Sequence, residues 1–525
     1  MLNFCRVSAG SWRLHGKFFH AKVLMDHQVT GKIPNFRYLI IYMSKSILII
    51  GAGIGGLSAG CYAQRNGFRS EIVEMNTYAG GLCTSWKRKE FTFDGCIHWL
   101  VGTQPGSEFY RLWEEIGAVQ GKEFYYYDYF TRYTDLDGHE FVAYGDPDKF
   151  CEHLISISPE DAKLIRRFTG DIKRIMRQDM PVDYNLKTGL KALPSLLLFM
   201  KYRMPLSKFA ARFKSPLLRK LFIEALDWHD MPAIFIFWTL ALMGGKKAGY
   251  PIGGSAGLIS SIVQKYEELG GTVRYNKKVE TILVENGKAV GVRFADGTEQ
   301  RADYILSAAD GHRTIFEWLG GKYASASLRK HYETLPLFPC LVYISLGLNR
   351  DYSHEPYGFQ YQLKNPVTIG SDELKAIGIR NHWFDHTLFP EGRSILTVML
   401  QQDYKYWEPL KADRQAYLAE KARIGEQVLS LLEERYPGIR GHIEVMDIST
   451  PLTFERYTGN WKASYEGWLM TPKNITLQLP QKLPGLENFY MAGHWISPGG
   501  GLPSGLITGR GAIKKICKKE RIPFR

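Results

Sequence analysis

The stretch Ser-Ile-Leu-Ile-Ile-Gly-Ala-Gly-Ile-Gly-Gly at residues 46–56 decides the fold class of this chain. Residues 46–50 form a short apolar, β-branched run, which is typical of a buried parallel strand. Gly51, Gly53 and Gly56 follow in G-x-G-x-x-G spacing, and residues 57–66 are predicted to form a helix. In this order the glycines permit a tight turn, close approach of a pyrophosphate, and close packing of the helix on the sheet. The stretch therefore predicts an α/β fold of the Rossmann type.

The residues after this turn indicate which kind of dinucleotide binds. A second predicted strand, residues 70–74, ends in Glu74, where a carboxylate suits a ribose 2′-hydroxyl and disfavours the 2′-phosphate of NADP. An NAD domain would continue with further strand–helix units, whereas this chain continues with Gly80-Gly81. A second glycine pair suits close passage beside a long, extended dinucleotide. A membrane span over residues 46–64 is disfavoured because its five glycines make it a poor span.

The missing part of the sheet is expected far downstream. Residues 253–269 predict a helix capped at Ser255, and strands are predicted at 272–275, 279–285, 289–294, 304–308 and 488–492. The last strand leads into the glycine-rich loop 493–505 and a predicted helix over 506–515, which is an anion-binding arrangement. The cofactor domain is therefore expected to be assembled from residues 44–130, 245–320 and 475–525. An inserted α+β domain facing the substrate and the membrane would comprise residues 131–244 and 321–474.

The first 42 residues differ in composition from the rest of the chain. They are basic, contain one acid, Asp26, and lack the apolar core of a secretory signal. An organelle transit peptide fits the charge bias, but Ser and Arg are sparse. We expect residues 1–43 to be an extension outside the fold, with Met43 as the true start, because the strand at residue 46 needs nothing upstream.

Composition excludes several classes of protein. The 525 residues are 45% hydrophobic and 23% charged, which is ordinary globular usage and excludes wholesale disorder, collagen and coiled coil. The seven cysteines form no C-x-x-C pair, so no zinc ribbon or redox dithiol is predicted, no metal site is expected, and a reducing compartment is favoured. A formal net charge of +14 favours an anionic partner, either nucleic acid or a membrane surface.

The position of the basic residues favours the membrane. Residues 184–223 contain nine basic residues and no acid, interleaved with Leu196–Met200, Phe209, Phe213, Leu217 and Leu218. Such a segment suits anionic lipid, and a helical cap whose cations face water is the equal alternative. Nucleic acid is not expected, because no motif for it accompanies the charge. The uncharged residues 231–245 are too few to span a bilayer and suggest a core helix or the wall of an apolar tunnel. We expect a cytoplasmic or peripheral membrane protein without a transmembrane helix.

The chain from Ser46 onward resembles the flavin-dependent phytoene desaturase and retinol saturase group, within the amine-oxidase-like FAD superfamily. The resemblance is carried by glycines 51–56 with Glu74, Gly80-Gly81, Asp94-Gly95, Gly253-Gly254, the Val279 strand, the stretch 450–460 and the loop 493–505. Two positions depart from many relatives. Leu82 stands where they have Arg, and His494 stands where they have Asp.

This resemblance implies non-covalent FAD. It places the pyrophosphate at Gly51, Gly53, Gly55 and Gly56, the adenosine ribose at Glu74, the adenine at the backbone of Val279, and close passage of the cofactor at Gly80 and Gly81. The flavin end would lie at the 493–505 loop, through Gly493, Gly505 and the following Leu506.

An enzyme of this kind moves a hydride between the flavin and a carbon of its substrate, and one acid–base group helps the accompanying proton transfer. The candidates are His98 and His494, followed by Tyr465 and Glu466. No second glycine fingerprint provides a built-in NAD(P)H domain, so a quinone, oxygen or a transient partner exchanges electrons with the flavin.

The leading hypothesis is an FAD-dependent oxidoreductase that desaturates or saturates carbon–carbon bonds of an apolar isoprenoid at a membrane surface. Two alternatives remain at this point. One is a flavin amine oxidase acting on a soluble amine. The other is a prenyl-lipid escort protein that keeps the fold but has lost the flavin.

Overall fold

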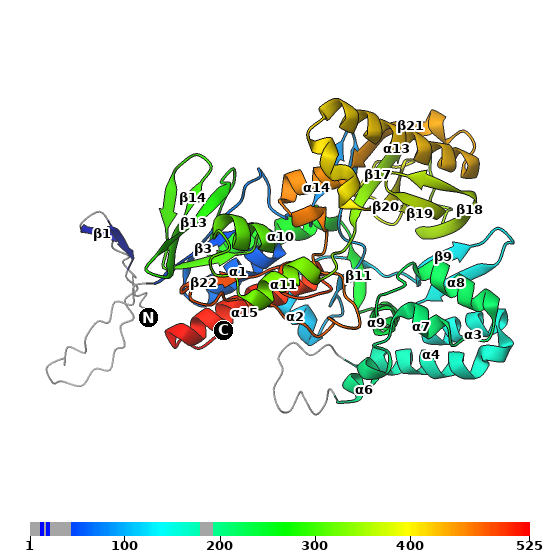
Figure 1. Ribbon diagram of the computed structural model, residues 1–525, viewed down its shortest axis with the longest axis horizontal. Coiled ribbons are helices and arrows are strands. Elements are labelled where there is room, and N and C mark those ends of the chain that lie inside the picture. Colours follow the sequence, from blue (N-terminus) through cyan, green and yellow to red (C-terminus); the bar gives the residue numbers. More distant parts are fainter. Residues whose placement is uncertain (1–10, 15–16, 21–43, 179–192) are drawn as a thin grey trace, which may run out of the picture.

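The computed structural model describes residues 11–14, 17–20, 44–178 and 193–525 (Figure 1). Within the first 43 residues it describes only a hairpin of β1 (Ser11–Leu14) and β2 (Lys17–His20). The expectations for the rest of that segment, and for residues 184–192 of the basic stretch, lie outside the described residues.

A five-stranded parallel sheet joins strands that are widely separated in the sequence. Its order is β12-β4-β3-β16-β22, and every neighbouring pair is parallel. The strands are β3 (Ser46–Ile50), β4 (Arg69–Val73), β12 (Thr272–Arg274), β16 (Tyr304–Ser307) and β22 (Phe489–Met491). The predicted Rossmann-type domain built from discontinuous segments is therefore confirmed, while its outer boundaries stay a prediction.

Both faces of this sheet are covered, which explains why its strands are apolar without alternation. Ile47 and Ile49 pack toward the helices, whereas Leu48 and Ile50 pack toward a second, antiparallel sheet. That second sheet consists of β13 (Val279–Glu285), β14 (Lys288–Phe294) and β15 (Glu299–Arg301). Its two turns contain the Asn286-Gly287 and Asp296-Gly297 pairs.

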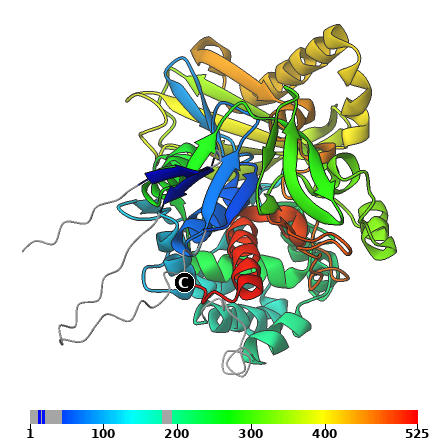
Figure 2. The same ribbon diagram turned by 90° about the vertical axis from the view of Figure 1, so that its left-hand side faces the viewer.

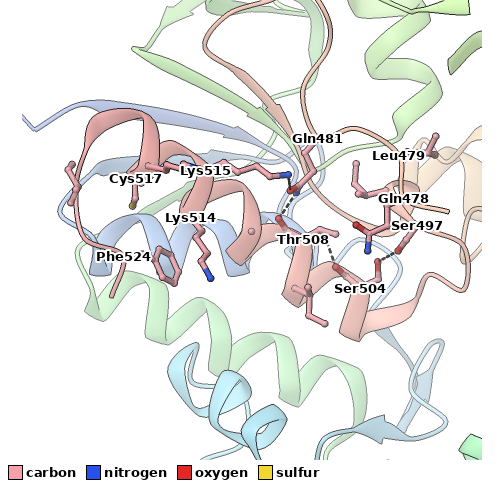
Figure 3. Close-up of a pocket in the computed structure, with 15 residues that line it drawn as sticks. Gln478, Leu479, Gln481, Ser497, Ser504, Thr508, Lys514, Lys515, Cys517 and Phe524 are labelled. Atoms are coloured by element: carbon pink, nitrogen blue, oxygen red, sulfur yellow. Dashed lines mark hydrogen bonds between the residues drawn. The ribbon is translucent and has the colours of Figure 1, made fainter. Parts of the chain in front are cut away.

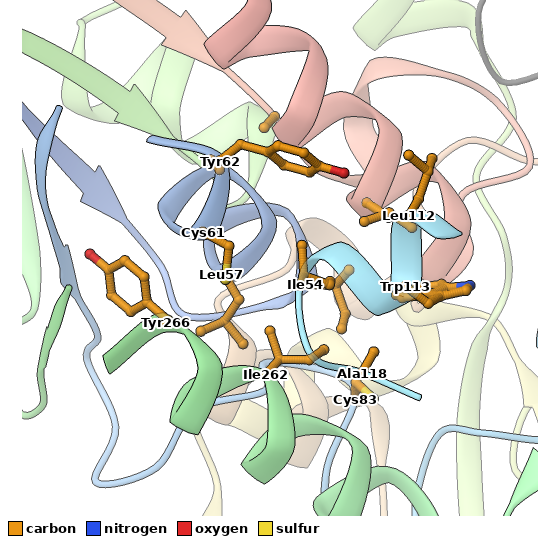
Figure 4. Close-up of a cluster of buried hydrophobic side chains, with 14 of the residues drawn as sticks. Ile54, Leu57, Cys61, Tyr62, Cys83, Leu112, Trp113, Ala118, Ile262 and Tyr266 are labelled. Atoms are coloured by element: carbon orange, nitrogen blue, oxygen red, sulfur yellow. The ribbon is translucent and has the colours of Figure 1, made fainter. Parts of the chain in front are cut away.

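Helices α1 (Ile54–Arg65), α10 (Gly254–Glu268) and α15 (Gly501–Glu520) cover the first face. Figure 4 shows Leu57 and Cys61 of α1 facing Ile262 and Tyr266 of α10, with Trp113 of α2 (Glu108–Glu115) nearby. Gly253, not Ser255, is the N-cap of α10, so the predicted cap is wrong. The Ser255 hydroxyl instead donates to buried Asp94.

A seven-stranded mixed sheet forms the base of the other domain, at the upper right of Figure 1. Its order is β10-β9-β18-β19-β20-β17-β21. The strands are β9 (Tyr129–Thr134), β10 (Glu140–Tyr144), β17 (Cys340–Leu348), β18 (Gly358–Ile369), β19 (Asp372–Asn381), β20 (Ser394–Gln402) and β21 (Ile443–Ser449). One face packs on helix α13 (Arg414–Arg435) through residues such as Ile344, Val398 and Ile424. The opposite face is therefore free to line a cavity.

A group of helices packs against β9 and β10 at the lower right of Figure 1. They are α3 (Pro147–Ile157), α4 (Ala162–Met176), α6 (Leu193–Lys201), α7 (Leu206–Ala210), α8 (Pro216–Leu226) and α9 (Ala233–Gly244). Phe209 and Phe213 are buried among them, whereas Lys208 and Arg212 are exposed. Together with the mixed sheet they form the predicted α+β substrate domain.

The two domains lie side by side in Figure 1, and in Figure 2 the parallel-sheet domain faces the viewer. The other described elements are shorter. The strands are β5 (Ser85–Arg88), β6 (Phe91–Asp94), β7 (Leu100–Val101), β8 (Phe124–Tyr125) and β11 (Ala248–Pro251). The helices are α11 (Ala326–Thr334), α12 (Tyr404–Trp407) and α14 (Pro451–Thr458). Within the described ranges, no helix has both the length and the apolar character needed to cross a bilayer, as expected.

Candidate functional site

A large cavity, about 920 Å³ in volume, lies between the parallel sheet and the mixed sheet. Most of the predicted site residues line it, although they come from distant parts of the chain. These are Gly51, Gly53, Gly55, Glu74, Gly80, Gly81, His98, Val279, Gly493, His494 and Gly505. Gly56 and Leu506 lie behind this lining.

The first glycine turn has the shape that a bound pyrophosphate requires. Gly51 has a φ of +95°, in the region that favours glycine. A Cβ on Gly56 would lie 1.9 Å from the carbonyl oxygen of Gly51, so only glycine fits there. A Cβ on Gly53 would meet only the Gly80 carbonyl oxygen, at 3.8 Å, which leaves space at the start of α1 for a ligand. The N-terminus of α1 points its amide groups into that space.

Glu74 stands directly after β4 and is buried at the edge of this turn. Its Oε2 accepts a hydrogen bond from the Ala52 amide at 2.9 Å, and its Oε1 accepts one from the Asn76 amide at 2.9 Å. An ionised carboxylate has further acceptor positions, so it remains able to bind hydroxyl groups. Lys277 and Val279 line the same end of the cavity.

The second glycine pair runs beside the first turn. Gly53 and Gly80 form an isolated bridge, and the Gly80 amide donates to the Ala52 carbonyl at 2.9 Å. Gly80 has a φ of +127°, and a Cβ on it would lie 2.3 Å from the Cys83 carbonyl oxygen. The chain therefore passes close to the turn without placing side chains between them.

The C-terminal glycine loop touches the N-terminal turn, although more than 400 residues separate them in the sequence. A Cβ on Gly55 would lie 3.1 Å from Gly493, and a Cβ on Gly505 would lie 3.2 Å from the Gly55 amide nitrogen. The backbone positions that approach each other here need small residues. Two helix N-termini, those of α1 and α15, consequently open on one elongated space, which fits FAD.

The substrate side of the cavity is mostly apolar. Helix α9 supplies Phe235, Trp238 and Leu242, and the mixed sheet supplies Leu341 and Met399. Residues 231–245 thus form both a core helix and the wall of a channel, which were the two interpretations drawn from the sequence.

Both predicted histidines are held neutral. Burial lowers the pKa of His494 to about 4, and its Nε2 has no hydrogen-bond partner. Burial, followed by the charge of Arg380, lowers the pKa of His98 well below its usual value, and its Nδ1 is also unpaired. Each imidazole therefore offers a lone pair or a single N–H group to a ligand, and neither imidazole carries a positive charge.

Glu466 titrates near neutrality. Its side chain lines the cavity together with Tyr465, and burial raises its pKa to about 7. A carboxyl group with such a pKa exchanges protons readily at neutral pH. The structure therefore places the sequence's secondary candidate where it has the protonation behaviour of an acid–base group.

Sequence reasoning missed Arg380, which also lines the cavity. It lies in β19, where the alternate residues Ala376, Gly378 and Arg380 line the cavity and Ile377 packs in the core beneath the sheet. The alternation is visible in the sequence, but which face meets the cavity depends on the position of α13.

A second cavity, about 800 Å³ in volume, runs along the other side of α15. Figure 3 shows Lys515 reaching Gln481 and Ser504 reaching Ser497 across it. Its lining mixes lysines of α15 with Ile522 and Phe524. No predicted site residue lies here.

The turn between β9 and β10 groups Asp135, Asp137 and His139, whose ligand atoms lie within 4.8 Å of one another. The sequence did not predict this cluster. The Asp135 carboxylate already accepts hydrogen bonds from the Asp137 and His139 amides, and it lies 3.7 Å from Lys220. These contacts account for the cluster as part of the turn.

Comparison with known families agrees with this site. The profile of the family described as flavin containing amine oxidoreductase matches residues 54–319, slightly more than half of the chain.

Similar proteins of known activity cover nearly the whole chain. A prolycopene isomerase of Daucus carota is 25% identical over 499 residues, covering 88% of this chain and 78% of its own. A lycopene-forming phytoene desaturase of a Paracoccus species is 25% identical over 506 residues, covering 91% of this chain and 98% of its own.

Solved structures share the fold. An oxidoreductase from Methanosarcina mazei has a TM-score of 0.57 at 16% identity, covering 89% of this chain and all of that chain. A mutant of putrescine oxidase has a TM-score of 0.58 at 14% identity, covering 90% of this chain and 99% of that chain.

Proposed function

Because this chain belongs to the flavin containing amine oxidoreductase family, we propose that it uses FAD to add or remove hydrogen at carbon–carbon bonds of an isoprenoid polyene. The relatives named as phytoene desaturase and prolycopene isomerase support a polyene as the substrate class. FAD supplies the hydride-transfer chemistry when bound.

One observation carries this proposal. A single cavity extends from the glycine turns to an apolar channel lined by α9 and the mixed sheet. A hydrocarbon chain in the channel and a dinucleotide at the glycine turns would meet inside the protein. The same apolar lining disfavours a soluble amine as the substrate.

The protein's own residues hold the cofactor at several points in this proposal. Gly51, Gly53 and Gly55 bind the pyrophosphate with the N-terminus of α1, which Gly56 lets pack close to the turn, and Glu74 binds the adenosine ribose. Gly80 and Gly81 leave room for the extended cofactor beside that turn. Val279 meets the adenine with its backbone, while Gly493 and Gly505 bind the flavin end and Leu506 packs behind them.

A further task of the protein's residues is proton transfer at the substrate. His98 and His494 were the first candidates, and both are neutral in the cavity. Glu466 is the better acid–base group, because its pKa of about 7 lets it hold or release a proton at neutral pH. The proton added to or removed from the substrate carbon therefore passes through the Glu466 carboxyl group.

A membrane surface is the proposed source of the substrate. Helix α6 exposes Leu196, Leu197 and Met200, each with more than half of its surface accessible. The basic residues Lys208, Arg212 and Lys214 are exposed nearby in the sequence. Exposed apolar residues beside cations suit docking on anionic lipid, from which a polyene enters the channel.

Anaerobic spectroscopy of the purified holoprotein tests the proposal. Oxidised and photoreduced protein are each mixed with phytoene or lycopene in detergent, and the flavin absorbance is followed. We expect bleaching of the oxidised form by the more saturated polyene, or recovery of oxidised flavin from the reduced form with the more conjugated one. An unchanged flavin spectrum with every polyene, alongside oxidation of an amine panel, would overturn the proposal in favour of an amine oxidase.

A further inference from the structure

Arg380 brings a cation into a channel that is otherwise suited to a hydrocarbon. It lies in β19 in one row with Gly358 of β18 and Thr397 of β20, directly opposite both. Residues opposite each other in antiparallel strands project from the same face, and all three line the cavity. The guanidinium therefore belongs to the cavity floor.

Within the described part of the chain, no carboxylate or other acceptor pairs with this guanidinium. Two acids, Asp94 and Asp385, lie in the same region. The pKa of Tyr127 is raised mainly by burial, and the charges of Arg380, Asp94 and Asp385 also act on this one side chain. Both acids are engaged elsewhere.

Asp94 accepts hydrogen bonds from Tyr250 and from the Ser255 amide, each at 2.9 Å. Asp385 accepts hydrogen bonds from the Gly253 amide at 2.9 Å and from the Thr387 hydroxyl at 2.6 Å. A cation without a partner below the protein surface is costly, so its retention here calls for an anion that comes from outside the chain.

A second donor lies beside it. His98 lines the same cavity, and its pKa is lowered by burial and then by the charge of Arg380. A neutral imidazole with an unpaired buried Nδ1 carries one N–H group and one lone pair. Arg380 adds the planar fork of N–H groups that matches the two oxygens of a carboxylate.

We propose that Arg380, assisted by His98, binds a carboxylate at one end of the substrate, so that the substrate class is a polyene acid. This inference rests on the proposed function, because it names the polar end of the polyene that the channel binds. An unsubstituted hydrocarbon would leave the guanidinium unpaired after water has been displaced from the channel. A carboxylate neutralises it and fixes which end of the chain enters first.

Equilibrium titration of the oxidised holoprotein tests the inference. The probes are all-trans-retinoic acid, its methyl ester and lycopene, and binding is read from perturbation of the flavin spectrum. We expect the acid to bind at least about tenfold more tightly than the ester, which corresponds to one charge-assisted ion pair. Arg380→Leu removes this preference by weakening only the acid, and Arg380→Lys keeps part of it.

Lys375→Leu is the matched control, because it removes a cation from the same strand at an exposed position outside the cavity lining. This variant is expected to keep both FAD and the preference for the acid. The flavin content of each protein is measured first, and Arg380→Lys serves if the leucine variant does not fold.

Three results overturn the inference alone. Equal dissociation constants for acid and ester in the wild-type protein show that no anion is recognised. An unchanged preference in Arg380→Leu assigns the recognition to another group, and loss of FAD from both Arg380 variants assigns Arg380 to the cofactor. In each of these cases binding of the ester or of lycopene leaves the proposed function standing. Failure of all three probes to bind removes the proposed function and the inference together.

Discussion

The carboxylate of Glu74 accepts a hydrogen bond from the backbone amide of Ala52 at 2.9 Å. The residue that follows β4 thereby holds the glycine turn that follows β3. Ala52 lies between Gly51 and Gly53, two of the glycines at which we place the pyrophosphate. The same carboxyl group is thus placed to fix the conformation of the turn and to bind the ribose.

Replacement of Glu74 by Gln tests this double role. In wild type, one carboxylate oxygen of Glu74 accepts from the Ala52 amide and the other accepts from the Asn76 amide. The Gln side chain has an NH2 group in place of one of these oxygens, so one of the two hydrogen bonds is lost. We expect FAD affinity to fall by about tenfold or more, measured by titrating apoprotein with FAD. Glu71→Gln is the control, since it changes the same strand where Glu71 pairs with Arg274. Similar FAD affinities for the two variants would contradict the role of Glu74.

Gly56→Ala should disrupt the turn itself. Its new methyl group would lie 1.9 Å from the Gly51 carbonyl oxygen, so α1 has to move away from the sheet. We expect protein with little bound FAD and a thermal midpoint several degrees lower. Gly170→Ala is the control, because that helical glycine has open space for a methyl group and alanine favours the helix. A normal flavin content in Gly56→Ala would show that the turn is not a tight fit.

Glu466 makes stability depend on pH. Burial raises its pKa from an ordinary 4.5 to about 7, so the folded protein favours the protonated form. Its contribution to the free energy of unfolding is fully present below pH 4.5 and is lost as the pH rises through 7. The effect is on the order of 1 kcal/mol for each unit of pKa shift.

Glu466→Gln should therefore gain stability relative to wild type between pH 5 and pH 8, as measured by urea denaturation at both values. Other titrating groups, such as Asp310, are common to both proteins and cancel in the comparison. In wild type the rate of flavin reduction should change with pH near pH 7, and the same substitution should remove this dependence. Parallel stability curves for the two proteins would show that Glu466 is ionised like a surface glutamate.

The exposed apolar residues of α6 should govern membrane binding. Replacing Leu196, Leu197 and Met200 by Gln removes apolar surface that is 53%, 65% and 56% exposed, without changing charge. We expect flotation with anionic phosphatidylserine-containing vesicles to fall severalfold. Leu418→Gln on α13, where the side chain is 46% exposed, is the control. Equal flotation of both variants and wild type would place the membrane contact elsewhere.

Much of the fold was predictable, because the parallel strands carry local signals. Residues 279–285 were predicted as a strand with the bounds that the structure gives, and the Gly51 turn followed from spacing alone. The ends of helices were less accurate. Helix α15 begins at Gly501 and not at 506, since glycines that disfavour a helix lie where the loop and the helix meet.

The site was harder to predict than the fold. Neutral histidines and a titrating Glu466 arise from burial, which depends on how two domains meet and not on neighbours in the sequence. Arg380 depends on strand register, because a shift of one residue would turn it into the core beneath the sheet. The spacing of charged residues in the sequence predicts neither this burial nor the strand register.

The parallel sheet also has a consequence for how the protein is made. Strand β22 and helix α15 leave the ribosome long after β3 and α1, yet they complete the same layer. Translation proceeds at about 5–20 residues per second, so the nascent amino-terminal half waits with an unpaired strand edge for many seconds. FAD binding at the paired glycine turns therefore has to wait until β22 and α15 have been synthesised, which is the order of assembly that this topology imposes.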